Sequence, residues 1–210
     1  MSPELLQPMQ NEAIDPNNVY LFALRTAKEI CSSYEIDENV KAAFRGLCLY
    51  FSNDTRFETE GYGKLNKGLF LSGNVGTGKT LLMTAFKMNE RKPFTIVSTD
   101  KVSFNYEIDG PESLLKYSPN DMIPPLYSRA FCFDDIGSES VPTVHMGNRI
   151  NVMERIILSR YEKRIPFPYT HFTTNLVDGE AIESLYGKRV RSRIREMTNL
   201  IVIPGNDRRQ

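Results

Sequence analysis

The stretch GNVGTGKT at residues 73–80 has the residue types and the spacing of a phosphate-binding loop. Gly73 and Gly78 enclose four residues and are followed by Lys79 and Thr80. Glycine lets the backbone turn so that successive amides point at phosphate oxygens, at the positive end of the helix that follows. We expect Lys79 to reach the β- and γ-phosphates of a nucleotide and the Thr80 hydroxyl to coordinate Mg²⁺. The predicted phosphate-binding residues are Gly73, Asn74, Val75, Gly76, Thr77, Gly78, Lys79, Thr80 and Leu81.

Two adjacent carboxylates are the second group with chemical potential. Asp134 and Asp135 follow the mostly apolar residues 130–133, which we interpret as a buried strand. Ligands bind at the carboxyl ends of the strands in open parallel sheets, so both aspartates are placed to meet the phosphates. We expect Asp134 to hold Mg²⁺, directly or through water, and Asp135 to polarise the attacking water. Glu139 is a second candidate for the same water.

A polar side chain also ends the β-rich run HFTTN at residues 171–175. Asn175 by itself is typical of a turn, and that interpretation stays open when the residue is taken alone. Its place in the chain after the loop and the two aspartates favours a catalytic role instead. We expect its amide to orient the attacking water or to touch the γ-phosphate.

A basic segment, YGKRVRSRIREM, follows near the carboxyl end. Its cationic residues are Lys188, Arg189, Arg191, Arg193 and Arg195. On a helix Arg189 and Arg193 share one face, and Arg191 and Arg195 share another, so they cannot all point at one ligand. One of them is a candidate arginine finger, which stabilises transition-state charge in the ATP site of a neighbouring subunit. A solvated basic helix is the alternative.

A few isolated residues complete the inventory. Arg208 or Arg209 is placed to reach a phosphate within the same chain. His145 and His171 lack a partner at metal-ligand spacing, and we interpret both as structural.

Apolar runs between these motifs predict the scaffold. The run KGLFLS precedes the glycine-rich loop, and further apolar or β-branched runs occupy residues 92–100, 127–137, 167–176 and 198–205. Helix-like segments separate most of these runs; one of them, residues 149–164, places Ile150, Met153, Ile157 and Tyr161 on one face. This alternation predicts an α/β fold in which helices cover both faces of a parallel sheet.

The amino-terminal part has a different character. Residues 1–17 are polar and contain three prolines, so we expect a flexible arm. Residues 17–34 and 37–54 look helical, and Asp37 is placed to cap the second helix. Apolar residues at helical spacing in the second helix are Val40, Phe44, Leu47 and Phe51. We therefore divide the chain into an arm with a helical extension, residues 1–60, and an ATPase domain, residues 61–210.

The composition excludes several classes of protein. The 210 residues carry 26 basic and 26 acidic side chains, so any polyanion must bind to a local patch. The cysteines Cys31, Cys48 and Cys132 are odd in number and widely spaced, which favours reduced core residues over a disulfide framework or a zinc site. The sequence shows no signal-peptide pattern and no apolar run of about 18 residues, so we expect a cytoplasmic protein.

Taken together, the motifs resemble those of the AAA+ ATPases of the DnaC and IstB group. The likeness lies in KGLFLSGNVGTGKT, FCFDDIGSE, ILSRYEKR leading into HFTTNL, and YGKRVRSRIRE, in that order, and covers roughly residues 65–205. The first motif by itself is specific only for a P-loop, and the ordered set is far more specific.

This resemblance implies a three-layer α/β/α P-loop fold of the AAA+ (ASCE) type, with five parallel strands in the order 5-1-4-3-2. It implies ATP and Mg²⁺ as cofactors and assembly into a ring or spiral in which each site is completed by the next subunit. By position it matches Walker A to Lys79 and Thr80, Walker B to Asp134 and Asp135, sensor 1 to Asn175, the trans arginine finger to Arg193, and sensor 2 to Arg208.

The implied function is that of a helicase loader in DNA replication. Such a protein binds a replicative DNA helicase, here through the amino-terminal extension, and single-stranded DNA through the ATPase assembly. Many AAA+ proteins have glutamate after the first Walker B aspartate, so the shorter Asp135 implies slow hydrolysis, stimulated by assembly or DNA. The chain ends soon after the predicted fifth strand, so we expect no carboxyl-terminal helical lid.

Three other functions remain open at this point. An IstB-type transposition helper uses the same ATPase core on double-stranded DNA and recruits a transposase, and the short amino-terminal part disfavours it. A small-molecule kinase built on the same P-loop would need an arginine-rich lid and an acceptor pocket, whereas this chain offers a Walker B motif with two carboxylates, a polar sensor and a late arginine-rich helix. A nucleotide-gated DNA-binding module with little hydrolysis is compatible with Asp135.

Overall fold

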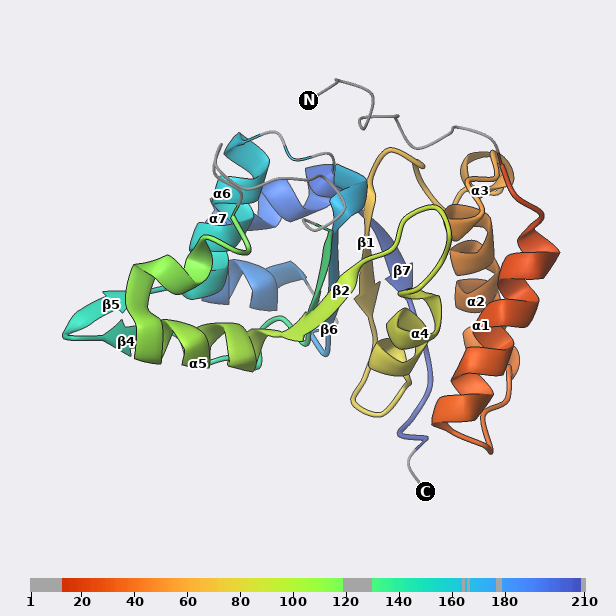
Figure 1. The fold of residues 1–210 in the computed structure, drawn as a ribbon, viewed down its shortest axis with the longest axis horizontal. Helices are drawn as coiled ribbons and strands as arrows, with labels where there is room; N and C mark the ends of the chain where they lie inside the picture. Colours follow the sequence, from red (N-terminus) through yellow and green to blue (C-terminus); the bar gives the residue numbers. More distant parts are fainter. Residues whose placement is uncertain (1–12, 119–129, 164, 166, 177–178, 209–210) are drawn as a thin grey trace, which may run out of the picture.

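A five-stranded parallel sheet forms the centre of the molecule (Figure 1). The computed structural model describes residues 13–118, 130–163, 165, 167–176 and 179–208. The strands of the sheet are β1 (Gly68–Ser72), β2 (Thr95–Ser98), β3 (Phe131–Asp134), β6 (Thr170–Thr174) and β7 (Thr198–Val202). Their spatial order is β2-β3-β6-β1-β7, which is the predicted order 5-1-4-3-2 read from the opposite edge.

Helices cover both faces of this sheet, as the alternation of strand and helix patterns predicts (Figure 1). They are α1 (Pro16–Ile30), α2 (Glu38–Phe51), α3 (Arg56–Thr59), α4 (Lys79–Phe86), α5 (Thr99–Asp109), α6 (Val152–Glu162) and α7 (Gly179–Met197). Short 3-10 turns lie at Gly110–Leu114 and Phe167–Tyr169. No helix within the described ranges is long and apolar enough to cross a membrane.

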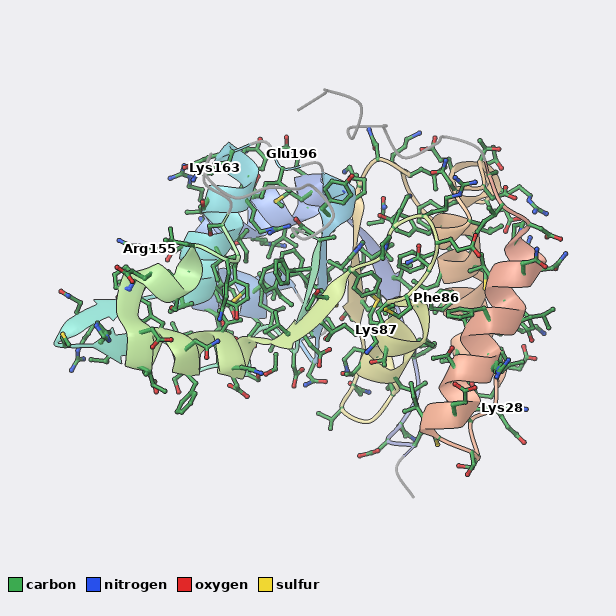
Figure 2. All side chains as sticks on the ribbon, viewed as in Figure 1. Lys28, Phe86, Lys87, Arg155, Lys163 and Glu196 are labelled. Carbon is green, nitrogen blue, oxygen red and sulfur yellow. The ribbon has the colours of Figure 1, made fainter. Side chains whose placement is uncertain are left out.

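The sheet separates two hydrophobic clusters, whose side chains are drawn in Figure 2. On one face α1, α2 and α4 pack over Leu69 and Leu71 of β1. There Phe86 of α4 contacts the rings of Phe44 and Phe51, with centroids 5.4 and 5.2 Å apart. On the other face α5, α6 and α7 pack over Phe70, Phe133 and Phe172. Alternate residues of a strand thus serve opposite layers, as the pleat requires.

The amino-terminal helices form as expected and belong to the first of these layers. The Asp37 carboxylate accepts hydrogen bonds from the amides of Asn39 and Val40 and so caps α2. The predicted apolar face of α2 is fully buried: Val40, Phe44, Leu47 and Phe51. The arm was expected to reach residue 17, but α1 already begins at Pro16, with Asp15 as its cap. Residues 1–12 of that arm lie outside the described residues.

Two local features differ from the sequence-based expectations. A small antiparallel hairpin, β4 (Thr143–His145) with β5 (Asn148–Ile150), precedes α6. Ile150 therefore lies in a strand, and α6 starts only after Asn151, whose side chain accepts from the amide of Glu154. The basic helix α7 is broken at Gly187, where φ is 82°. Glycine adopts such a conformation at no steric cost, so the break is encoded by the residue itself.

Candidate functional site

The glycine-rich loop connects β1 to α4, as the sequence predicts. Gly78 precedes the helix with φ of 94°, a conformation that favours glycine. Gly73 is equally constrained, because a Cβ atom there would lie 2.4 Å from the carbonyl oxygen of Ile203 on the next segment. Both glycines are thus required by the backbone path, in addition to any phosphate contact.

Lys79 is held at the centre of the loop. Its ammonium group donates to the carbonyl oxygens of Gly73 and Asn74, both at 2.8 Å, and to Oδ1 of Asn175 at 2.6 Å. The residue is only 6% exposed. These bonds place the charge beside the loop amides, where a phosphate group would bind.

The predicted magnesium ligands, Thr80 in the first turn of α4 and Asp134 at the end of β3, lie side by side. The Thr80 hydroxyl lies 3.0 Å from both carboxylate oxygens of Asp134. Thr173 of the neighbouring strand donates to Asp134 Oδ1 at 2.6 Å and accepts from the amide of Asp135 at 2.8 Å. Thr173 was not singled out from the sequence, because one threonine in a β-branched run carries no special signal. Hydroxyl and carboxylate oxygens are the ligands that Mg²⁺ prefers, so this pair fits the ion.

Magnesium in nucleotide sites is bound by only one or two protein side chains together with phosphate oxygens. Within the described ranges no group of three or more His, Cys, Asp or Glu residues is placed to hold a metal ion. Thr80 and Asp134 are a pair of side chains of this kind.

Asp135 has an unusual backbone for a residue with a side chain, with φ of 63°. Aspartate and asparagine tolerate this region better than other such residues. Its amide bonds to Thr173 and its carbonyl oxygen accepts from the Thr99 hydroxyl at 3.0 Å, so the conformation is fixed from two sides. Its carboxylate accepts from Nδ2 of Asn175. Asn175 consequently bridges the lysine of the loop and the second aspartate.

These groups face a cavity of about 590 Å³. Its lining residues are Cys31, Ser33, Tyr34, Glu35, Val75, Gly76, Gly78, Lys79, Thr80, Leu81, Asp135, Asn175 and Arg208. Gly73, Asn74 and Thr77 of the predicted set support the loop from behind: the first two bond Lys79, and the Thr77 hydroxyl donates to Asn74 O at 2.9 Å.

One wall of the cavity was missed by sequence reasoning. Residues 31–35, in the connection between α1 and α2, form it. Tyr34 in this wall is buried, which raises the pKa of its phenol to about 12 and keeps it neutral. The connection has no motif spacing, and its contact with the loop spans more than forty positions of sequence, so no local pattern could have revealed it.

Arg208 reaches the cavity, but its guanidinium binds protein groups. Its amide donates to the carbonyl oxygen of Gly76 at 3.1 Å, which fixes the backbone against the loop. Its side chain donates to Asp37 Oδ2 at 2.6 Å and to Glu35 O at 3.1 Å. The alternative candidate, Arg209, lies outside the described residues.

Glu139 is not brought to the cavity. Its carboxylate accepts from the Tyr186 hydroxyl and, at 2.9 Å, from the amide of Gly137. Glu139 is buried, with 6% of the residue exposed, and Tyr186 of α7 is its side-chain partner. The spacing of four residues after Asp135 placed it near in sequence, but the turn at Gly137 directs it toward α7.

The basic residues of α7 divide between two faces, as predicted. Arg189 pairs with Glu162 of α6 at 2.7 Å. The Arg193 guanidinium lies 4.1 Å from the ring centroid of Tyr161, which is also in α6. Arg191 and Arg195 instead line a separate cavity of about 410 Å³ beside β1 and β7. Arg193 does not line the cavity that contains Lys79, and its role toward a neighbouring subunit stays a prediction.

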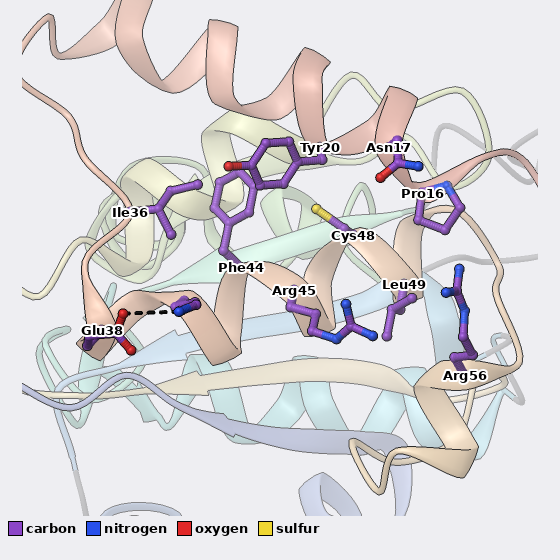
Figure 3. A pocket seen from close by; sticks show the side chains of 11 residues that line it. Pro16, Asn17, Tyr20, Ile36, Glu38, Phe44, Arg45, Cys48, Leu49 and Arg56 are labelled. Carbon is purple, nitrogen blue, oxygen red and sulfur yellow. Dashed lines mark hydrogen bonds and ion pairs between the residues drawn. The ribbon is translucent and has the colours of Figure 1, made fainter.

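Another cavity, about 480 Å³ in volume, lies between α1 and α2 (Figure 3). Tyr20, Phe44 and Leu49 contribute its apolar lining, and Lys41 and Arg45 are among its charged residues. It contains no residue of the motifs described above.

Comparisons with known proteins agree with this fold. No protein-family model and no curated protein sequence matches the chain. The solved structure of a DnaC helicase loader superimposes with a TM-score of 0.53 at 20% identity, covering 83% of this chain and 95% of that one. A DNA replication initiation factor superimposes with a TM-score of 0.52 at 16% identity over 82% of this chain; the match spans only 48% of that protein.

The chain has the AAA+ type of P-loop fold. Within this AAA+ fold, the loop before α4, the carboxyl end of β3 and the end of β6 meet at one edge of the sheet. The predicted fold class is therefore confirmed, and Asn175 directly follows β6, the strand that lies between β1 and β3.

Proposed function

We propose that this chain binds ATP together with Mg²⁺ and hydrolyses its terminal phosphate. The observation that carries the proposal is the single cavity shared by Lys79, Thr80, Asp135 and Asn175, with Asp134 bonded to Thr80. Few other ligand classes need a loop of amides, a lysine, a hydroxyl–carboxylate pair and a water-orienting amide at once.

In the proposed binding mode, the loop amides and Lys79 hold the phosphates at the amino terminus of α4. Thr80 and Asp134 would hold the magnesium, which would supply positive charge to neutralise the phosphate oxygens. The wall formed by residues 31–35 is the part of the cavity left for the base and sugar. Tyr34, which is 7% exposed, is the aromatic residue of this wall.

In the proposed hydrolysis, Asp135 accepts the proton of the attacking water and Asn175 orients that water. The carboxylate of Asp135 already accepts a hydrogen bond from Asn175, so both groups are held on one side of the cavity. Aspartate is one methylene shorter than glutamate, so we expect slow turnover. Glu139 is left out of this mechanism, because Tyr186 and Gly137 occupy its carboxylate.

We further propose that the ATPase acts in DNA replication as a helicase loader, with a replicative helicase and single-stranded DNA as partners. The likeness to a DnaC helicase loader, which covers most of both chains, supports this role. Self-assembly would supply Arg193 to a neighbouring site, and its position on α7, outside its own cavity, suits that use. A transposition helper with the same ATPase core, or a nucleotide-gated DNA-binding module, is the competing function.

Two experiments test the ATPase proposal and the helicase-loader proposal separately. Calorimetric titration of the chain with ATP and Mg²⁺ is expected to show one site per chain, and absence of heat and of any turnover contradicts the nucleotide proposal. Co-sedimentation with the purified replicative helicase of the host is expected to require ATP. Association with a transposase and no association with the helicase would instead support the transposition role.

A further inference from the structure

The carboxylate of Asp37 joins two parts of the molecule. Its Oδ1 atom accepts from the amides of Asn39 at 3.0 Å and Val40 at 3.1 Å, which caps α2. Its Oδ2 atom accepts from the Arg208 guanidinium at 2.6 Å. Arg208 in turn lines the same cavity as Lys79. One side chain therefore links the first turn of α2 to the wall of the cavity that Lys79 also lines.

The backbone and the side chain of Arg208 are held by different parts of the molecule. Its backbone amide is bonded to Gly76 of the loop, so the residue is anchored beside the cavity. Its guanidinium faces the connection between α1 and α2, where it also donates to Glu35 O and lies 5.8 Å from the ring centroid of Tyr34. Only the side chain needs to move for the charge to reach a ligand in the cavity.

We infer that Asp37 is a positioning residue that competes with the terminal phosphate of a bound nucleotide for Arg208. The inference rests on the proposed ATP site and adds the source of its discrimination between ATP and ADP. Guanidinium binds phosphate through paired, charge-assisted hydrogen bonds. The side chains of Arg208 and Asp37 are 29% and 43% exposed, so their ion pair belongs to the weak, solvent-screened class. A γ-phosphate can therefore displace Asp37, whereas ADP presents no such group.

The position of Asp37 gives this exchange a consequence outside the nucleotide site. Tyr34 and Glu35 line the proposed nucleotide cavity. Ile36 and Glu38, on either side of Asp37, line the cavity between α1 and α2 (Figure 3). The connection between the helices is thus a wall shared by both cavities. Release of Arg208 removes one of the bonds that fix this wall. Binding of the terminal phosphate would thus loosen the side of the α1–α2 cavity that the connection forms.

The chain offers matched variants to test the exchange. Asp37→Asn removes the charge but keeps an oxygen that caps α2 equally well. Glu38→Gln removes the same charge from the next residue, which pairs with Lys41 and not with Arg208. Arg208→Ala, alone and combined with Asp37→Asn, completes a double-mutant cycle. The measurement is calorimetric affinity for Mg²⁺ with a non-hydrolysable ATP analogue and for Mg²⁺ with ADP.

Removing the competitor is expected to raise the affinity for the ATP analogue relative to ADP by about fivefold, the worth of a partly exposed ion pair. Glu38→Gln is expected to keep the wild-type ratio. Arg208→Ala is expected to lower the ratio, and adding Asp37→Asn to that variant is expected to change nothing further. Asp37→Ser, which also caps a helix, replaces Asp37→Asn if that variant unfolds.

Three outcomes contradict the inference. The ratio in Asp37→Asn equals that of wild type, or Asp37→Asn has the same effect with and without Arg208, or Glu38→Gln raises the ratio as much. In each of these the wild-type chain still binds nucleotide, so the proposed ATP site survives. A wild-type chain that binds neither nucleotide overturns the proposed function and this inference together.

Discussion

Asn175 accepts a hydrogen bond of 2.6 Å from the ammonium group of Lys79. The same amide donates from its nitrogen to Asp135, so a single side chain connects the residue that would hold the phosphate with the residue that would activate water. In the mechanism proposed above, a phosphate that drew the Lys79 ammonium group away would leave the Asn175 oxygen available to the attacking water, while the Asn175 nitrogen would still donate to Asp135. The proposed mechanism thus predicts that occupation of the phosphate site is coupled to the orientation of the attacking water.

Asp135→Asn is predicted to separate binding from hydrolysis. Asparagine tolerates the positive φ of this position and can still accept the bond from Asn175, but it cannot take a proton from water. We expect turnover to fall by about 100-fold or more, with ATP affinity within a few-fold of wild type. Steady-state phosphate release and calorimetry measure the two quantities. A variant that hydrolyses ATP at the wild-type rate removes Asp135 from the mechanism.

Thr173→Val is predicted to destabilise the fold, because valine keeps the shape and removes the hydroxyl that serves Asp134 and the amide of Asp135. The part-buried amide of Asp135 loses its hydrogen-bond acceptor and the Asp134 carboxylate loses one of its donors, so we expect the free energy of unfolding to fall by about 1–3 kcal/mol. Thr95→Val on the exposed edge strand β2 is the control and is expected to change it by less than about 0.5 kcal/mol. Urea unfolding gives both values, and equal stability of the two variants would refute the bridging role of Thr173.

His171 is predicted to make the fold sensitive to acid. The ring is fully buried beside Phe94, and burial together with the nearby charges of Lys92 and Arg160 lowers its pKa to about 3. The folded state therefore keeps the imidazole neutral, while the unfolded chain takes up a proton below about pH 6.5. This contribution to stability is complete above pH 6.5 and is lost as the pH falls toward 3.

The pH dependence can be assigned to His171 by substitution. His171→Phe keeps an aromatic ring against Phe94 but cannot bind a proton. Between pH 6 and 4 its free energy of unfolding is expected to fall less steeply than that of wild type, by up to about 1.4 kcal/mol per pH unit. Parallel slopes in the two proteins would exclude His171 as the source.

Arg193→Ala is predicted to impair hydrolysis in an assembly and to spare nucleotide binding. The guanidinium packs on Tyr161 and pairs with Glu196, and neither residue lines the cavity that contains Lys79, so we expect an effect on turnover to come from a neighbouring site. Arg189→Ala, which loses only a surface pair with Glu162, is the control. Mixing the Arg193→Ala chain with a hydrolysis-deficient Asp135→Asn chain tests whether one subunit supplies its Arg193 to the ATP site of another. Unchanged turnover in all mixtures would remove the finger role.

Much of the site was predictable because its chemistry lies in short motifs at the ends of strands. The loop at residues 73–80 and the pair Asp134–Asp135 each combine a local pattern with an adjacent apolar run, and the parallel order of strands then brings them together. Asn175 followed from the same rule.

What the sequence did not reveal depends on contacts between distant segments. Tyr34 lies in a connection without periodic pattern and becomes part of the site only by packing of the helical extension against the loop. Glu139 has the right chemistry and spacing, but Tyr186 from α7 binds its carboxylate. Arg208 has the charge for a phosphate, and Asp37, 171 positions away, binds it in this structure. In each case a competing partner decides the role, and no single-sequence pattern identifies that partner.

The central claim, that this chain is an ATPase with Lys79 in its phosphate site, is tested most directly by ATP binding and turnover in Lys79→Ala. Lys87→Ala, which removes a lysine just past the end of the same helix and outside the cavity, is the matched control. We predict that Lys79→Ala loses ATP affinity by at least about 100-fold, together with all turnover, while Lys87→Ala matches wild type. Wild-type affinity and turnover in a folded Lys79→Ala protein would contradict the site and the function proposed from it.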